Sequence, residues 1–387
     1  MGIMPLSAAQ KQTNFTSLLH FVLFVLATLP YSAAHKLGHD CIHNNVALRV
    51  SLISAQRYER DRRQQSWESI RITFDFNGID SSLPAAQRTY ITKLITDAGD
   101  WLRASLMVKR VFGNLKFEDF AGTDEKRGDV NLAASKYTKY IITGVAADVV
   151  IFVLAQVASD CATGDVLAYA THCRQDQYDR PTFGYIQMCP QQMAVKTIQA
   201  EQDEDFHTSV HEITHILGYS SSLFPFFRDI NGASYTVRCG DPSTHPTSWL
   251  SPVFTYTEGT KGTGNPDNKQ YAESWCCDSN TIGWPPWKCQ YEYWEFQVAD
   301  TVLKVQTVGG DLDRVGNTSR MLVTPGLVSV ARQHFGCPTL AGVELEDDGG
   351  EGSADSHWEE SQMMSEYMGA APSGFRNVKS NLTLALL

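Results

Sequence analysis

Two histidines and a glutamate stand at a spacing that suits metal chemistry. His211 and His215 lie four positions apart, and Glu212 directly follows the first of them. On a helix, residues at i and i+4 project from the same face, so two imidazole nitrogens can reach one metal ion. Zinc binds such nitrogens at about 2.0–2.1 Å and, in catalytic sites, keeps one position for water. Glu212 would lie beside that water and could accept its proton.

The residues around these three favour a buried helix that ends abruptly. Gly218 follows the last apolar position, and glycine just past a helix end lets the chain turn back. The order of residues matches the start of the metzincin pattern His-Glu-x-x-His-x-x-Gly-x-x-His. The position of the third histidine is occupied by Ser221. The apolar residues of the helix are Val210, Ile213, Ile216 and Leu217.

A third protein ligand must therefore come from further along the chain. Three histidines follow the helix: His245, His334 and His357. His245 lies in a stretch rich in Pro and Thr, and His334 lies in a predicted helix, where a solvent-facing histidine is the ordinary interpretation. His357 follows a glycine-rich loop and precedes Trp358. Spacing alone leaves all three open.

The elements that must position these residues are predicted by apolar periodicity. Residues 70–76 alternate as a half-buried strand should, and residues 82–108 have the spacing of a long amphipathic helix. Residues 148–154 form a continuous apolar run, typical of a buried strand, and residues 182–188 predict another strand. This order indicates an α+β fold class. We expect residues 182–188 to be the sheet edge that pairs with an extended peptide.

Beyond the motif the sequence changes character. Residues 240–283 are rich in Pro, Gly, Ser, Thr and Trp with little periodicity, which predicts a loop-dominated insertion. Residues 325–335 favour a helix, and residues 344–355 form an acidic, glycine-rich loop. The cysteines that would hold the insertion are Cys239, Cys276, Cys277 and Cys289.

Composition and charge indicate a globular protein, and the N-terminal residues indicate export. Hydrophobic residues make up 43% of the 387 residues, and the formal net charge of -11 argues against a nucleic-acid partner. Residues 18–29 are apolar except for His20 and precede small residues at 32–34. This run is too short for a bilayer of about 30 Å and is typical of a signal peptide. A buried N-terminal helix is the alternative interpretation.

Cysteines and glycosylation sequons agree with export. The chain has nine cysteines. Those from Cys161 onward form an even set, which permits 105 pairings if all are bonded, whereas Cys41 stands apart. Asn317 and Asn381 each begin an Asn-x-Ser/Thr sequon, which is an acceptor for glycans in an exported chain.

Several separate segments resemble sequences of the leishmanolysin family, in the same order. They are residues 161–190, 211–218, 330–337, 342–346, 356–359 and 366–368, and the resemblance covers most of residues 36–387. It implies a metzincin-type catalytic domain with a mixed sheet, one zinc ion, and a long insertion before the third zinc ligand. That ligand would be His357. Met368 would be the methionine of the Met-turn, packed beneath the metal, with Met364 as the alternative.

The resemblance also gives Cys41 a role. Residues 38–43 resemble the His-x-Cys-x-His stretch of the family's propeptide. The implied cysteine switch would place the Cys41 thiolate at the fourth zinc position and keep the enzyme latent. The alternative is an unpaired or intermolecular cysteine.

The predicted organisation has five parts. Residues 1–34 are the signal peptide, 35–63 the propeptide, and 64–218 the N-terminal catalytic subdomain that ends with the zinc-binding helix. Residues 219–340 form the disulfide-rich insertion, and 341–387 carry the third ligand and the Met-turn. The family's further C-terminal domain and a GPI signal are expected to be absent.

The expected function is a secreted or cell-surface zinc endopeptidase that acts on proteins or peptides. The first alternative is a catalytically silent adhesion or binding protein on the same scaffold, which loss of Glu212 or of a ligand would favour; none is lost. The second is a zinc hydrolase that acts on other substrates. The sequence gives no indication of oligomeric state.

Overall fold

The computed structural model describes residues 67–110, 113–116, 138–162, 164–176, 178–233, 235, 302–307, 318–347, 353–370 and 377–387, with five short strands besides. All of them belong to one compact unit, His39–Leu387. The predicted signal peptide and Cys41 lie outside the described residues. Among the described helices, none combines the length and apolarity that a membrane crossing requires.

Strands and helices are interspersed along the described part of the chain, and α3 and α5 are the longest helices. In order they are β1 (Ala55–Gln56), β2 (Trp67–Ser69), β3 (Ile72–Ile79), α3 (Ala85–Ser105), β4 (Met107–Lys109), β5 (Glu125–Arg127), β6 (Val130–Leu132), α4 (Thr138–Ile142), β7 (Val149–Ala155), η3 (Ser159–Cys161), β8 (Ala168–Asp176), β9 (Pro181–Met188), α5 (Gln199–Leu217), η4 (Phe224–Phe226), β10 (Tyr271–Ala272), β11 (Trp294–Glu295), β12 (Leu303–Thr307), β13 (Thr318–Leu322), α6 (Pro325–His334), β14 (Val343–Glu344), α7 (Glu360–Met363) and α8 (Asn381–Leu386).

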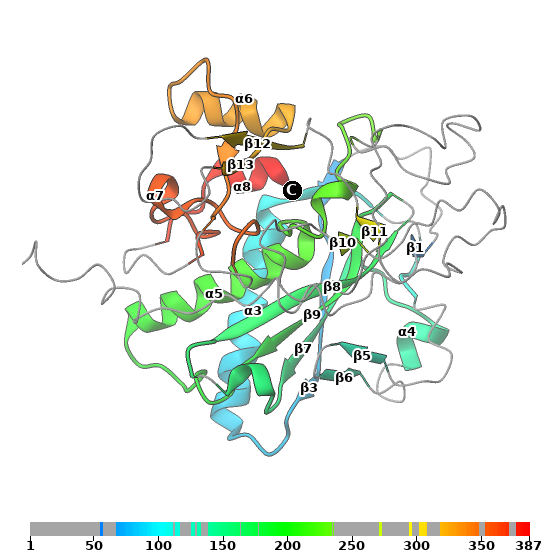
Figure 1. Ribbon diagram of the computed structural model, residues 1–387. Helices are drawn as coiled ribbons and strands as arrows, with labels where there is room; N and C mark the ends of the chain where they lie inside the picture. Colours follow the sequence, from blue (N-terminus) through cyan, green and yellow to red (C-terminus); the bar gives the residue numbers. More distant parts are fainter. Residues whose placement is uncertain are drawn as a thin grey trace, which may run out of the picture. The chain divides into compact units, whose positions relative to one another are not determined.

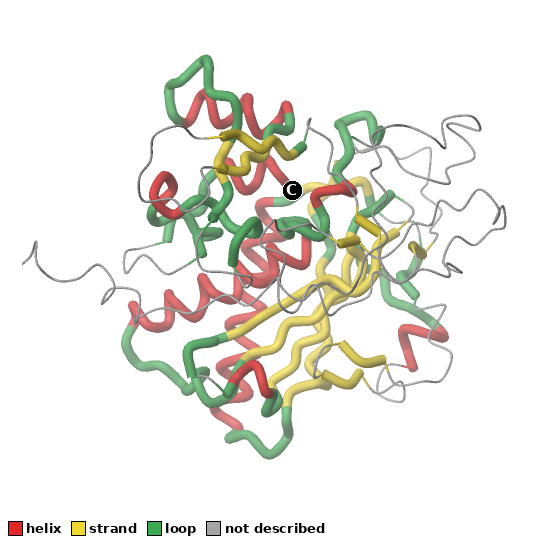
Figure 2. The backbone as a smooth tube through the Cα atoms, in the orientation of Figure 1, coloured by secondary structure: helices red, strands yellow, loops and turns green. Residues whose placement is uncertain are grey.

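The main sheet is mixed, as predicted for the α+β unit. Its strand order is β1-β8-β9-β7-β3. Strands β3, β7 and β9 pair in parallel, whereas β8 runs antiparallel to β9. The two long helices α3 and α5 contact each other, and both pack against the strands (Figures 1 and 2). The metal-site motif therefore lies on a helix that the sheet supports.

The prediction that residues 182–188 form a sheet edge is wrong. Strand β9 lies inside the sheet, with β7 on one side and β8 on the other. Apolar patterning reports which faces of a strand are buried, and it carries no information about which backbone edges are paired. Strand β8 was itself missed, because it contains Thr171, His172 and Arg174, polar residues that are nevertheless buried.

The continuous apolar run of β7 is explained by burial on both faces of the sheet. Val149, Ile151 and Val153 join the core cluster that includes α3 and α5. The alternate residues Val150, Phe152 and Leu154 join a second cluster on the other face, together with Tyr140 of α4. Full burial of each such side chain stabilises the fold by roughly 1.5–3 kcal/mol. Strand β7 therefore contributes strongly to the stability of the sheet.

The long helix is shorter than the pattern predicted. Helix α3 covers Ala85–Ser105 instead of residues 82–108. Leu106 adopts an extended conformation, with φ -113 and ψ 137, and the next three residues form β4, which pairs antiparallel with β2. The described residues contain a disulfide between Cys161 and Cys189, a pairing that the sequence leaves open, and it ties the turn after β7 to the end of β9.

The C-terminal part adds a smaller sheet and two helices that share the hydrophobic core of α3 and α5. Strands β12, β13 and β14 make a small antiparallel sheet, and α6 contacts both β14 and α8. The predicted helix at 325–335 is thus confirmed as α6. Isolated bridges join Trp358 to Leu345 on one side and to Gly369 on the other. These bridges bring His357, which precedes Trp358, into ordered structure.

Candidate metal centre

Helix α5 presents the motif from a buried face. His211, Glu212 and His215 are all buried, with exposed fractions of 6%, 0% and 0%. The helix ends at Leu217, and Gly218 is its C-cap, as predicted. The chain then turns so that the carbonyl oxygen of Tyr219 lies 2.6 Å from His215 Nδ1.

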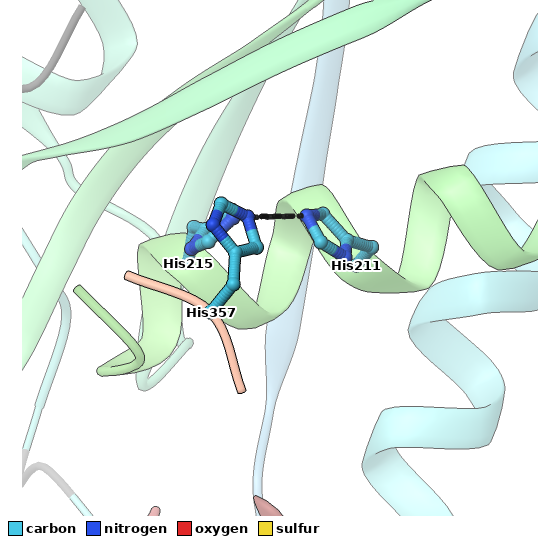
Figure 3. A group of neighbouring side chains, drawn as sticks. All are labelled: His211, His215 and His357. Atoms are coloured by element: carbon cyan, nitrogen blue, oxygen red, sulfur yellow. Dashed lines mark hydrogen bonds between the residues drawn. The ribbon is translucent and has the colours of Figure 1, made fainter. Parts of the chain in front are cut away.

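The structure brings His357 to the two histidines of α5. The Nε2 atom of His211 lies 3.0 Å from that of His215 and 3.2 Å from that of His357 (Figure 3). His357 is fully buried. Of the other two candidates, His334 is exposed at the end of α6, and His245 lies outside the described residues. His357 is therefore the candidate that joins the cluster.

Backbone carbonyl groups fix the protonation of all three rings. The Nδ1 atoms of His211, His215 and His357 lie 2.8, 2.6 and 2.6 Å from carbonyl oxygens. A carbonyl oxygen can only accept, so each Nδ1 carries the proton and each Nε2 of a neutral ring presents a lone pair. Three lone pairs that face one another repel unless a cation lies between them. The carbonyl groups belong to Tyr367, Tyr219 and Ser353.

The donor set fits zinc. Nitrogens bound at 2.0–2.1 Å with tetrahedral geometry are about 3.3 Å apart, close to the observed spacing of the Nε2 atoms. Histidine ligands commonly donate their second N–H to a carbonyl group, which orients the ring. Among the described residues, these three histidines form a buried group whose ligand atoms lie within 4.8 Å of one another.

The two candidate Met-turn residues lie in different environments. Met368 is fully buried in the core, whereas Met364 is 64% exposed. The backbone next to Met368 takes part in the site, because the Tyr367 carbonyl group accepts the hydrogen bond from His211. The Met368 carbonyl group accepts a hydrogen bond of 3.0 Å from the Trp358 N–H. The turn thus connects the strand-like segment of His357 with α5.

Burial dominates the electrostatics near the cluster. It raises the pKa of Glu366, although hydrogen bonds from Thr383, Met368 and Ser380 oppose the shift. Burial also raises the pKa of the Tyr219 and Tyr367 hydroxyls, which are therefore neutral at physiological pH.

Sequence reasoning missed the groups that support the histidines. The three accepting carbonyl groups are backbone atoms, which residue type does not reveal. Glu366 and Thr383 were also missed as supporting residues. The only available signal for Glu366 was its place in the 366–368 segment that resembles the leishmanolysin family.

The family model for leishmanolysin peptidases matches residues 79–238 and 291–387, more than half of the chain. The chain belongs to the leishmanolysin family. The first matched stretch contains the motif of α5, and the second contains His357 and Met368. Residues 239–290, between the two, fall within the predicted insertion, while Cys41 precedes both.

Curated relatives agree with the family. The chain is similar to the leishmanolysin-like peptidases of Drosophila melanogaster, 34% identical over 244 residues, and Caenorhabditis elegans, 32% identical over 243. Each alignment covers 62% of this chain, but only 29% and 30% of the relative. A ciliated left-right organizer metallopeptidase of Mus musculus is 35% identical over 95 residues, 24% of this chain and 13% of that protein. The chain thus spans about 30% of the length of the first two leishmanolysin family relatives.

Proposed function

We propose that the chain is a zinc-dependent endopeptidase, in which His211, His215 and His357 hold one zinc ion through Nε2. The observation that carries this proposal is the convergence of three buried Nε2 lone pairs, each fixed by an Nδ1–H to carbonyl hydrogen bond. Membership of the leishmanolysin family supports it. Zinc bound there would lower the pKa of a coordinated water to about 7 and polarise the scissile carbonyl group.

Glu212 is proposed as the general base. It directly follows His211 on α5, and its side chain is fully buried. Burial disfavours the charged form of a carboxylate, so transfer of a proton from the attacking water to the carboxylate is favoured. It would then pass this proton to the leaving amine nitrogen. Because Glu212 and His211 lie on the same helix, the general base would need no loop movement to reach water bound at the metal site.

The test replaces Glu212 and measures zinc and hydrolysis separately. Once residues 35–63, the predicted propeptide, have been removed, the wild-type chain is expected to contain one zinc and to cleave casein, and a zinc chelator should stop the cleavage. Glu212→Gln should keep the zinc and lose hydrolysis by roughly 10²–10⁴-fold, the usual contribution of a general base.

Glu201→Gln is the matched control, since Glu201 is exposed on the first turn of the same helix. It should leave zinc content and hydrolysis unchanged. Undiminished cleavage by Glu212→Gln would disprove the role of this carboxylate, and a wild type without zinc would disprove the metal site. A silent adhesion protein would hold zinc but cleave no substrate in the same assay.

Export and latency are further proposals that rest on sequence alone. Residues 1–34 would direct secretion to the outside or surface of the cell, and Cys41 would hold the enzyme latent through its thiolate. Cys41→Ser should then yield a chain that cleaves casein without removal of residues 35–63. A wild type that is equally active before processing would contradict the cysteine switch.

A further inference from the structure

A buried pair of hydrogen bonds joins the neighbour of His357 to the Met-turn. The indole Nε1–H of Trp358 donates to Thr383 Oγ1 at 2.8 Å. The same hydroxyl of Thr383 donates to Glu366 Oε1 at 2.7 Å. Trp358 and Thr383 are fully buried, and Glu366 is 5% exposed. Water therefore cannot readily replace a lost partner in either hydrogen bond.

The direction of both bonds is fixed by chemistry. An indole N–H can only donate, so the Thr383 hydroxyl must accept from Trp358. Its own proton is then left for the carboxylate of Glu366. A side chain at position 383 must donate and accept through one oxygen, which serine and threonine do and valine, of the same shape, does not.

Glu366 carries the connection into the turn. Its Oε2 accepts from the Met368 N–H at 2.6 Å. Its Oε1 also accepts from Ser380 Oγ at 2.7 Å and from the Ser380 N–H at 3.4 Å. The carboxylate thus binds the Met-turn to the start of α8, which begins at Asn381.

Both ends of this network lie next to proposed zinc ligands. Trp358 directly follows His357, and the Trp358 N–H also donates to the Met368 carbonyl group at 3.0 Å. At the other end, the carbonyl group of Tyr367, between Glu366 and Met368, accepts from His211 Nδ1 at 2.8 Å. A path of hydrogen bonds and covalent links therefore runs from the residue after His357, through Thr383 and Glu366, to the ring of His211.

We propose that Thr383, on α8, is a positioning residue of the zinc site. Its two hydrogen bonds hold His357 in place relative to the Met-turn. The proposal rests on the zinc site of the proposed function and extends it to a helix that supplies no ligand. Partners one layer beyond the ligands typically change metal affinity by 10–100-fold. Because Thr383 acts through Trp358, we expect a change near the lower end, about tenfold.

The experiment measures zinc dissociation constants by competition with a chromophoric chelator. Thr383→Val should weaken zinc binding about tenfold, while Thr383→Ser, which keeps both hydrogen bonds, should stay within about threefold of wild type. The visible absorption spectrum of the cobalt-substituted chain should change in Thr383→Val and be restored in Thr383→Ser. This spectrum reports ligand geometry without any catalytic assay.

Two controls separate positioning from other effects. Leu382→Ala removes a fully buried neighbour on α8 that makes no side-chain hydrogen bond. It should lower thermal stability but leave zinc affinity unchanged. Asn381→Gln removes the glycosylation sequon that Thr383 completes, and Asn381 is exposed. It should also leave zinc affinity unchanged, so a glycan cannot account for the effect of Thr383→Val.

Each outcome decides the question. Unchanged zinc affinity in Thr383→Val, or an equal loss in Leu382→Ala, would overturn the proposal. If Thr383→Val does not fold, Glu366→Gln replaces it. The amide, of the same size, cannot accept all four donors of the carboxylate, so weaker zinc binding is expected and wild-type affinity would overturn the proposal. A wild type that binds no zinc would instead refute the proposed function itself.

Discussion

Helix α5 and the segment 353–370 bring histidines to the same place in different ways. In α5, His211 and His215 are placed by the helix itself, which is stabilised by its own hydrogen bonds and by contacts with α3, β8 and β9. The segment contains only the four-residue α7. His357 is placed by partners distant in sequence, including the Glu346 N–H, which donates to its carbonyl group at 2.9 Å. The geometry of the first pair is local, and that of the third histidine depends on tertiary structure.

The two regions meet where a shorter metzincin would have its third histidine. That position is Ser221, and its N–H donates to Ser356 Oγ at 3.0 Å across 135 sequence positions. The chain therefore leaves the site after α5 and returns to nearly the same point one residue before His357.

The largest expected effect comes from removal of the distant histidine. His357→Ala should weaken zinc binding by more than about a hundredfold, because even outer-layer partners account for 10–100-fold. Two imidazoles on α5 would remain, but they do not complete a zinc site. Chelator competition measures the change.

His334→Ala is the matched control, since this histidine is exposed at the end of α6. It should bind zinc as wild type does. The comparison between the two regions would be wrong if His357→Ala kept wild-type affinity, or if both variants lost zinc equally.

Removal of zinc should sharpen the contrast between the regions. Three facing Nε2 lone pairs repel without a cation. His357 lies in a segment whose only helix has four residues, whereas His211 and His215 lie on the 19-residue α5. Hydrogen exchange should therefore rise by roughly tenfold or more in 353–370, while α5 and β7 change little. Equal protection in both regions after chelation would show that the segment is held without the metal.

The third prediction concerns a substitution that disturbs the packing of α5 against the sheet and does not change residues 353–370. Gly184 on β9 faces Ile216. A Cβ added at Gly184 would lie 2.5 Å from Ile216 Cγ2 and 2.9 Å from the backbone carbonyl oxygen of Thr171. Gly184→Ala should therefore cost about 1–3 kcal/mol of unfolding free energy, the usual penalty of overpacking. Urea denaturation measures the loss.

The control is a glycine with space around it. At Gly326 on α6, the nearest atom to an added Cβ is the Ala385 oxygen at 3.9 Å. Gly326→Ala should be neutral or stabilise by up to about 1 kcal/mol, because alanine favours helix. If Gly184→Ala were as stable as wild type, the close contact between β9 and α5 would not restrict the position of the helix.

The difference between locally determined elements and elements placed by distant contacts explains how much of the structure could be predicted from sequence. The motif helix, the buried strand at 148–154 and the helix at 325–335 follow from apolar periodicity, since each has its signal within its own residues. Spacing does not distinguish His357 from His245 and His334, and only the family resemblance favours it. Its position depends on Glu346, Ser353 and Met368, whose contacts no local pattern encodes.

The errors have physical causes of the same kind. Strand β8 has buried polar side chains, so its composition resembles an exposed segment. The edge assigned to residues 182–188 failed because strand order is a property of the sheet and not of one strand. The predictions for Cys41, the signal peptide and the cysteines of the insertion concern residues outside the described part of the chain.

The smallest expected effect is a pH dependence that arises in the first half of α5. Asp205 is buried there, and the Tyr90 hydroxyl donates to its Oδ2 at 2.6 Å. Burial raises its pKa from 3.8 to about 6; the hydrogen bond from Tyr90 and the charge of Lys196 oppose this, whereas Glu204 and Glu201 add to it. Between pH 4 and 6 the folded chain therefore keeps a proton that the unfolded chain has lost.

The sign of the effect follows from this difference. A raised carboxyl pKa stabilises the fold fully below about pH 4, and the contribution disappears as pH rises through about 6. If the whole pKa shift were converted into unfolding free energy, it would give roughly 3 kcal/mol. Water and nearby charges screen the site, so about 1 kcal/mol is expected.

Asp205→Asn lacks this titration. Its stability relative to wild type should therefore rise by about that amount between pH 4 and pH 7 in urea denaturation. Asp203→Asn, at a position exposed on the same helix, should show no such rise. A constant difference between Asp205→Asn and wild type would mean that this carboxyl group titrates normally in the folded chain.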